Sequence, residues 1–184
     1  MRFFRSLAVL TLSISSVVLH GCSDDQSPLS NSNEAEQAAR ALLTTLTLEQ
    51  KVGQMIQGEI AHVTPDDLRK YGLGSVLNGG GSFPGGEKNA SIDDWLALAD
   101  AFYQASIDTT EGSAGIPVIW GTDAVHGHNN VVGATLFPHN IGLGAAGDPA
   151  LVAAISGATA REVKATGIDW IFAPTVAVAR EDTT

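Results

Sequence analysis

The stretch that decides the fold is Ile116-Pro117-Val118-Ile119-Trp120-Gly121-Thr122-Asp123. Its first part, Ile116 to Trp120, is a short apolar run, which is typical of a strand buried on both faces. The run stops at a Gly-Thr-Asp turn, and polar residues follow it. In parallel sheets ligands bind just beyond the carboxyl ends of the strands. The stretch therefore predicts a buried parallel strand with candidate site residues directly after Trp120.

Two further apolar runs flank this strand, Gly74 to Leu77 before it and Ile168 to Ala173 after it. Residues just after Leu77 and Ala173 are therefore also site candidates. Helical patterns separate the three runs. The predicted helices are marked by their caps and apolar positions, which are Ser91 with Asp94 before Leu96, Leu98, Phe102 and Ile107, and Asp148-Pro149 through Val163 to a stop at Gly167.

Strands that alternate with helices of this length pair in parallel with right-handed crossovers. The sequence therefore predicts an α/β fold, and periodicity is compatible with either a doubly wound sheet or a (β/α)8 barrel. Further helices are predicted before the first strand. They are marked by Ala38, Leu42, Leu43 and Leu46 at helical spacing, by a capping box of Thr47 with Gln50, and by the start Thr64-Pro65-Asp66-Asp67.

Composition excludes several classes of function. The 184 residues contain 10 basic and 20 acidic side chains, for a net charge of −10, which argues against nucleic acid as a partner. The single cysteine, Cys22, excludes an intramolecular disulfide and a cysteine-based zinc site. The glycine-rich segment 79–86 lacks the Gly-Lys-Ser/Thr ending of a phosphate-binding loop, so we interpret it as a turn after a strand.

The first residues form a predicted export signal. Arg2 and Arg5 precede the apolar stretch Leu7 to Leu19, which is too short to span a bilayer. The ending Gly21-Cys22 resembles the processing site of bacterial lipoproteins, in which the cysteine is acylated. We therefore expect a signal peptide over 1–21, a flexible polar tether over 22–33, a domain over 34–184, and location in the periplasm or cell envelope through a lipid anchor on Cys22. An ordinary signal peptide with an incidental Cys22 is the alternative.

The turn after Trp120 carries the chemistry. Asp123, His126 and His128 lie within six positions of one another. A carboxylate at a strand end can accept hydrogen bonds from two vicinal hydroxyls, which suits a sugar. Three alternatives stay open: Asp123 caps a turn and backbone groups satisfy the histidines, His126 and His128 bind a metal, or one histidine is a lone general base.

The segment from Ile116 to Asn130 resembles the signature of family 3 glycoside hydrolases. The resemblance continues in the same order through Gly133 to Gly144, Ala165 to Ile168 and Phe172 to Arg180. It spans roughly Leu46 to Arg180, and the His-Gly-His-Asn-Asn form is similar to the β-glucosidases and exo-acting β-glucanases of the family.

This resemblance implies a (β/α)8 TIM-barrel-type domain that hydrolyses β-glucosides with retention of configuration and needs no cofactor or metal. Asp123 then binds hydroxyls of the terminal glucose, while His126, His128, Asn129 and Arg180 support the site. The family's nucleophile and general acid/base match no residue of this chain. A barrel takes about 250 residues, and 151 follow position 33. We therefore expect an incomplete barrel that is inactive by itself.

The expected partner is a β-glucan or β-glucoside, and the membrane is contacted through the lipid anchor alone. A non-catalytic sugar-binding lipoprotein and a metal-dependent barrel hydrolase using His126 and His128 are the competing functions. Three tryptophans are candidate sugar platforms. The spacing favours core packing for Trp95 and Trp170, and the position of Trp120 beside the Gly-Thr-Asp turn favours sugar contact.

Overall fold

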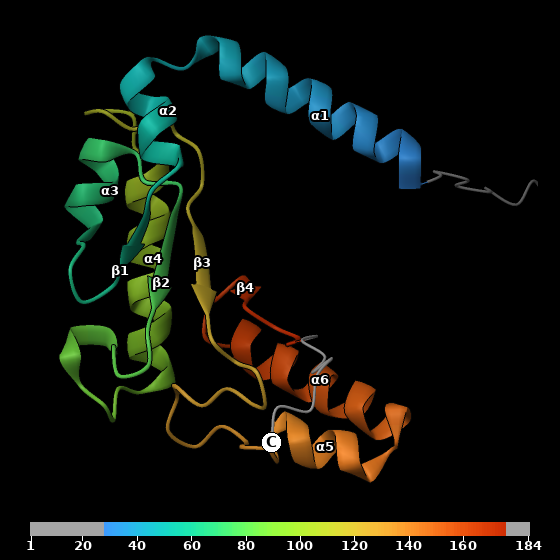
Figure 1. Cartoon of the computed structure of the whole chain (residues 1–184). Coiled ribbons are helices and arrows are strands. Elements are labelled where there is room, and N and C mark those ends of the chain that lie inside the picture. Colours follow the sequence, from blue (N-terminus) through green and yellow to red (C-terminus); the bar gives the residue numbers. More distant parts are fainter. Residues whose placement is uncertain (1–27, 176–184) are drawn as a thin grey trace, which may run out of the picture. The chain divides into compact units, whose positions relative to one another are not determined.

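Four parallel strands form the sheet of the computed structural model, which describes residues 28–175 (Figure 1). The strands are β1 (Gln57–Glu59), β2 (Ser75–Asn78), β3 (Ile119–Thr122) and β4 (Trp170–Ile171). The helices are α1 (Pro28–Thr45), α2 (Leu48–Gln54), α3 (Pro65–Tyr71), α4 (Ile92–Ile107), α5 (Asn140–Ala146) and α6 (Pro149–Lys164), with a short 3-10 helix η1 (Pro84–Gly86).

The order of the strands distinguishes between the two predicted α/β architectures. Neighbouring strands in the sheet are also neighbours in sequence, in the order β1-β2-β3-β4, and all three pairings are parallel. A doubly wound sheet reverses this order at a switch point, whereas a barrel adds each strand to the same side. The fold is therefore of the (β/α)8-barrel type, and the described residues contain four parallel strands of it.

Three capping boxes begin helices where the sequence predicts them. Thr47, Thr64 and Ser91 each accept a hydrogen bond from the backbone N–H of the third helical residue, and that residue's side chain bonds back to the cap. Helix α3 ends at Gly72, whose φ of 60° suits a residue without a Cβ. Local chemistry at these positions is sufficient to start and stop the helices.

The strand predicted from Ile116 begins three residues later, at Ile119. Pro117 has no N–H to donate to a neighbouring strand. The N–H of Val118 donates to the Ser106 hydroxyl of α4 at 3.0 Å, so it too does not join the sheet. Regular pairing with β2 starts when Ile119 N–H donates to the Gly74 carbonyl oxygen at 3.2 Å.

The structure also adds two elements that the sequence analysis does not predict. Strand β1 has the sequence Gln-Gly-Glu, which lacks an apolar run, and helix α5 contains two glycines. At the amino-terminal end, α1 begins at Pro28, so residues 28–33, which belong to the predicted tether, are helical. Residues 1–27, including the predicted signal and Cys22, lie outside the described part. No helix among residues 28–175 is long and apolar enough to cross a bilayer.

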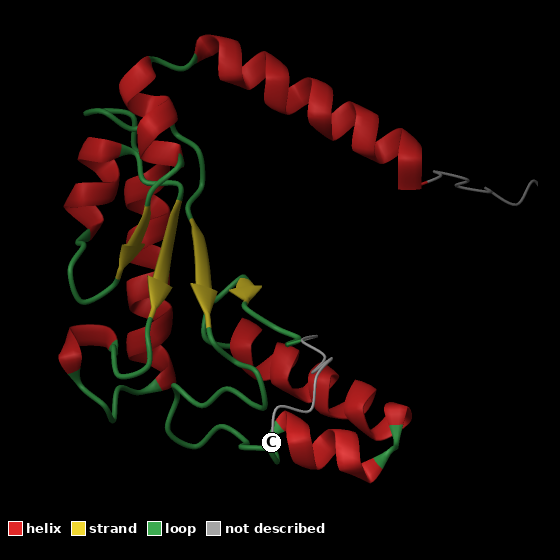
Figure 2. Cartoon of the chain, viewed as in Figure 1, coloured by secondary structure: helices red, strands yellow, loops and turns green. Residues whose placement is uncertain are grey.

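Helices cover one face of the sheet (Figure 2). The strand side chains that face these helices are buried, among them Val76 and Trp120, and they pack with α3, α4 and α6 in one cluster. Side chains of the opposite face are open, because Ile119 and Trp170 are 49% and 46% exposed. The residues of the apolar cluster include Leu68, Val76, Trp95, Phe102, Ala105, Val118, Trp120, Val163 and Ile168.

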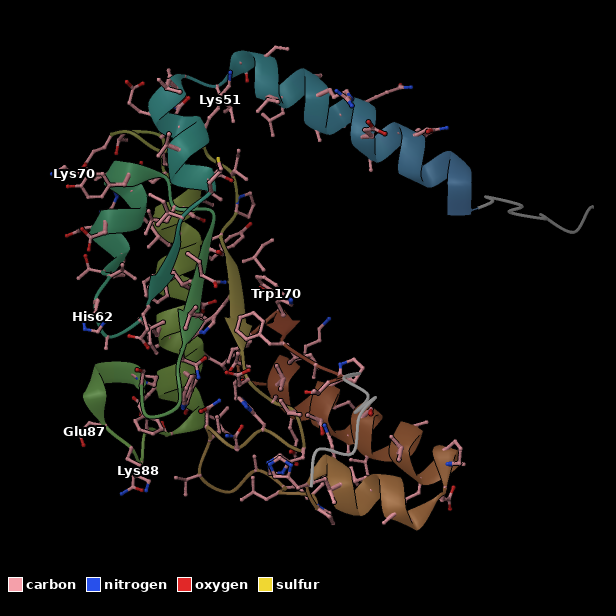
Figure 3. All side chains as sticks on the ribbon, in the orientation of Figure 1. Lys51, His62, Lys70, Glu87, Lys88 and Trp170 are labelled. Atoms are coloured by element: carbon pink, nitrogen blue, oxygen red, sulfur yellow. The ribbon has the colours of Figure 1, made fainter. Side chains whose placement is uncertain are left out.

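The structure contradicts the predictions for two of the three tryptophans. Trp95 packs in the core as predicted. Trp120 is 2% exposed, lies 5.8 Å from Trp95 between ring centroids, and donates its indole N–H to Asn78 Oδ1 at 3.0 Å, so it is no sugar platform in this sheet. Trp170, predicted to be core, is exposed at the β4 end of the sheet, where its ring meets Phe172 edge-on (Figure 3). Side chains along β4 alternate between the two faces of the sheet, and that of Trp170 lies on the face that these helices do not cover.

Candidate functional site at the carboxyl ends of the strands

Asp123 follows β3 directly and its side chain is exposed. Alternation along the strand places it on the same face as Ile119 and Gly121, which is the face that the helices leave open. It lines a pocket of about 420 Å³. The described residues around this pocket are Asp123, Val125, His126, Asn129, His139, Asn140, Ile141 and Thr175. The pocket thus combines one carboxylate with two imidazoles and two amides, a set of groups suited to hydrogen bonding a polyhydroxylated ligand.

His126 is held by a reciprocal pair of hydrogen bonds. Its Nδ1 lies 2.8 Å from the Phe137 carbonyl oxygen, which can only accept, so Nδ1 carries the hydrogen. The Phe137 N–H donates back to the His126 carbonyl oxygen, also at 2.8 Å. In the neutral ring Nε2 is then left as an acceptor. His126, which the resemblance gives as a supporting residue, thus lies in the wall of the pocket.

His139 is a pocket residue that the sequence analysis does not identify. Its ring lies against that of His126, with centroids 4.5 Å apart and planes tilted by 36°. The segment Phe137-Pro138-His139-Asn140 is part of the family resemblance, but no chemical pattern in the sequence singles out its histidine. Contact with His126 arises because the segment returns to the end of β3.

His128 has a different environment from His126. It is 1% exposed and is absent from the pocket lining, and its ring meets Trp95 edge-on with centroids 6.2 Å apart. The Thr166 hydroxyl donates to the Val163 carbonyl oxygen at 2.7 Å, so its oxygen accepts the hydrogen of His128 Nε2 at 3.0 Å. The other ring nitrogen, Nδ1, has no hydrogen-bond partner within the described residues. Burial lowers the pKa of His128 below its ordinary 6.5, and the nearby Glu162 carboxylate opposes this in part.

The alternative of a metal site on His126 and His128 gains no support. The two imidazoles have separate partners, Phe137 and Thr166, and His128 is enclosed by the core. Across residues 28–175, no group of three or more His, Cys, Asp or Glu side chains is arranged to hold a metal ion. The hydrogen bonds fit histidines that build a pocket wall and the core behind it.

The loop that carries the pocket is tied to α6. Glu162 of that helix accepts hydrogen bonds from the Thr135 hydroxyl at 2.8 Å and from the Thr135 N–H at 3.1 Å. Gly127, with φ of +119°, pairs with Leu136 across the loop. These contacts bring the His126 and Phe137 segments together and so set the shape of the pocket.

Glu59 and Asn78 are the last residues of β1 and β2, but their side chains form hydrogen bonds within the fold and do not line the pocket. The Glu59 carboxylate accepts hydrogen bonds from the N–H groups of Ala61 at 2.7 Å and Gly79 at 3.2 Å. Burial raises the pKa of Glu59, but hydrogen bonds led by that from Ser82 outweigh burial and lower it. The glycine-rich loop therefore donates to a carboxylate of the protein itself, in keeping with its interpretation as a turn. Asn78 accepts the Trp120 indole N–H, and its Nδ2 has no partner within residues 28–175.

A larger hollow, of about 960 Å³, lies elsewhere and is not the candidate site. Apolar and charged residues line it, and they come from α2, from the segment after β1, from α3 and from the segment just before β2, with Glu111 and Gly112 from the connection before β3. Most of these residues precede strands, so the hollow lies toward the amino ends. Two of its lining residues, Lys70 of α3 and His62 of the segment after β1, lie on the side of the molecule away from β3 and β4 (Figure 3). Barrel proteins bind substrates at the opposite, carboxyl end.

The remaining predicted site residues have the following positions. Asn129 is exposed and lines the pocket beside Asp123. Arg180 and the predicted lipidation site Cys22 lie outside the described residues. Among the sequence-predicted residues, the structure thus brings Asp123, His126 and Asn129 together and sets His128 behind them.

Comparison with known proteins identifies the family. Residues 47–184 match the sequence model of the glycosyl hydrolase family 3 N terminal domain. The chain belongs to glycoside hydrolase family 3. The match overlaps almost completely with the stretch from Leu46 to Arg180 that carries the resemblance, and the barrel-type topology agrees with this family.

Relatives of the family 3 chain include enzymes of known structure. The chain is 57% identical to an exo-1,3/1,4-β-glucanase from a Pseudoalteromonas species, with a TM-score of 0.77 over 80% of this chain and 18% of that one. It is 33% identical to a lysosomal β-glucosidase of Dictyostelium discoideum over 151 residues. That alignment covers 74% of this chain and 18% of the relative. A β-N-acetylhexosaminidase from Beutenbergia cavernae is 25% identical, with a TM-score of 0.52 over 70% of this chain and 38% of that one. The chain therefore spans about a fifth of the length of the two glucan- and glucoside-cleaving relatives.

Proposed function

We propose that the protein containing this chain hydrolyses terminal β-D-glucosyl residues of β-glucans or β-glucosides with retention of configuration. The observation that carries the proposal is the exposed Asp123 carboxylate in a pocket at the carboxyl end of β3, with His126 and Asn129 beside it. Membership of family 3 supports the reaction class, and the β-glucosidase and exo-β-glucanase relatives support a terminal glucosyl residue as the group transferred.

Asp123 is assigned to substrate binding and not to bond cleavage. A retaining mechanism requires two carboxyl groups about 5 to 5.5 Å apart on either side of the glycosidic bond. Asp123 is the single carboxylate among the described lining residues of the pocket. Glu59 is unsuited to a general acid, because its hydrogen bonds favour the ionised form. We therefore assign neither the nucleophile nor the acid/base to residues 28–175, and we propose that residues 22–184 alone lack turnover.

The same sequence supports a proposal for location. We propose export to the periplasm or cell envelope, with acylation of Cys22, because the apolar stretch Leu7 to Leu19 ends at Gly21-Cys22.

The decisive experiment is Asp123→Asn in the full-length protein expressed from its natural reading frame. Hydrogen bonds to a charged group contribute about 1.5 to 3 kcal/mol each. Weakening two of them at about 1.4 kcal/mol per decade lowers kcat/KM for an aryl β-glucoside by roughly 10²- to 10⁴-fold. The melting temperature should stay unchanged, because the side chain is exposed.

Asp100→Asn is the matched control, since Asp100 is an exposed carboxylate on α4 outside the pocket. It should retain full activity. Azide should not rescue Asp123→Asn, because no nucleophile has been removed. Formation of a glycosyl azide of inverted configuration by that variant would make Asp123 the nucleophile and disprove its binding role. An unmodified full-length protein with no activity on β-glucosides or β-glucans would disprove the proposed function itself.

A further inference from the structure

Asn130 is the buried amide behind Asp123. It is 5% exposed, and it does not line the pocket. Its Nδ2 group donates to the Thr122 hydroxyl oxygen at 2.9 Å and to the Asp123 carbonyl oxygen at 3.1 Å. Thr122 has no exposed surface. A single amide nitrogen therefore uses both of its hydrogens to close the loop onto the end of β3.

This amide completes a restraint on the two peptide groups that flank Asp123. The peptide group before Asp123 is held by the residue that follows β4, because the Thr122 carbonyl oxygen accepts a hydrogen bond from the Phe172 N–H at 3.0 Å. The following one is held by Asn130. With both peptide groups fixed, the backbone dihedral angles at Asp123 are fixed too, and they determine the direction of the Cα–Cβ bond. These bonds thus fix the direction in which the Asp123 side chain leaves the backbone, and this exposed side chain lines the pocket.

We propose that Asn130 is a positioning residue for Asp123, which holds the sugar-binding carboxylate in place through the loop backbone. This inference rests on the proposed function for the role of Asp123. It differs from the sequence prediction, in which the neighbouring Asn129 supports the site. Positioning by a rigid shell matters because a misplacement of about 1 Å can lower the rate of an enzyme by about 10²-fold.

The first test is Asn130→Asp in the full-length protein, with Asn130→Ala as a second variant. Aspartate keeps the shape of the side chain but has no N–H to donate when ionised. Each variant should lower kcat/KM for an aryl β-glucoside by about ten- to a hundredfold. Asn89→Asp, an exposed residue ahead of α4, makes the same change of side chain and should leave kcat/KM unaltered. Wild-type kcat/KM in both Asn130 variants would overturn the proposal.

A double-mutant cycle separates positioning from a general loss of folded structure. In an Asp123→Ala background there is no carboxylate left to aim, so adding Asn130→Asp should lower kcat/KM by less than about threefold. If Asn130→Asp lowered kcat/KM by the same factor in both backgrounds, Asn130 would act independently of Asp123. Thr122→Val repeats the test if the Asn130 variants do not fold. It removes one acceptor with little change of volume and should have a smaller effect, which must also disappear with Asp123→Ala.

Crystal structures of the wild-type and Asn130→Asp proteins test the inference even if the proposed reaction fails. The inference requires the Asp123 carboxylate to be displaced or to occupy several positions while β3 is unchanged. An Asp123 side chain in its wild-type place would overturn it. Absent turnover by the wild type together with a displaced Asp123 would instead reject the proposed function and leave the positioning role standing.

Discussion

Gly127→Ala is expected to disrupt the pocket loop, although Gly127 does not line the pocket itself. Gly127 has φ of +119°, and a Cβ added there would overlap the Thr135 carbonyl oxygen, with the Leu136 Cα at 3.2 Å. Both of these atoms belong to backbone, so the overlap cannot be relieved by turning a side chain. The two arms of the loop would have to separate.

The size of the effect follows from the contacts that hold the arms together. Alanine in the left-handed region costs about 1 to 3 kcal/mol. Separating the arms also weakens the hydrogen bonds that join His126 and Phe137 in both directions. Each of these two hydrogen bonds contributes about 1 kcal/mol, so their loss lowers the free energy of unfolding by about a further 2 kcal/mol. A domain of 150 to 250 residues loses about 2 to 4 °C per kcal/mol, so the clash adds about 4 to 8 °C to the loss of melting temperature.

Gly133→Ala provides the matched control within the same loop. Gly133 also has positive φ, +96°, but a Cβ there would meet no atom within 4 Å. It should show the cost of the dihedral angle without that of the clash. The assay is thermal unfolding of the full-length protein, together with kcat/KM on an aryl β-glucoside, which should fall at least about tenfold further in Gly127→Ala because His126 moves. Equal effects of the two substitutions would refute the reasoning.

Two further predictions concern His128 and Cys22. Because burial lowers the pKa of His128 below 6.5, the unfolded chain gains a proton before the folded one as the pH falls through that value, and the folded state loses stability on the acid side. In His128→Gln, the fall in melting temperature of the full-length protein from about pH 7.5 to about pH 5.5 should therefore be smaller than in the wild type. An equal fall would contradict a lowered pKa for His128. Cys22→Ser in the full-length protein should move it from the membrane to the soluble fraction on cell fractionation, whereas unchanged partitioning would rule out anchoring through Cys22.

Much of the barrel was predictable because short-range chemistry determines it. The capping boxes at Thr47, Thr64 and Ser91 satisfy helix N–H groups from within four residues, so their effect can be read directly from the sequence. Strand β2 is similarly evident from its apolar residues. Strand β1 was not, since Gln57–Glu59 contains no apolar run and pairs with β2 only through its backbone.

The sequence by itself determined the α/β class, the position of Asp123 after a buried strand and, through linked motifs, the resemblance to family 3. These properties depend on the order and spacing of residues along the chain. Tertiary structure decided the rest. Sequential strand order favoured the barrel over the doubly wound sheet, and burial separated His126 in the pocket from His128 in the core. The chain also had to fold back before His139 reached His126 and Asn130 reached Asp123. Such contacts depend on where a loop returns in space, which periodicity and local propensity do not specify.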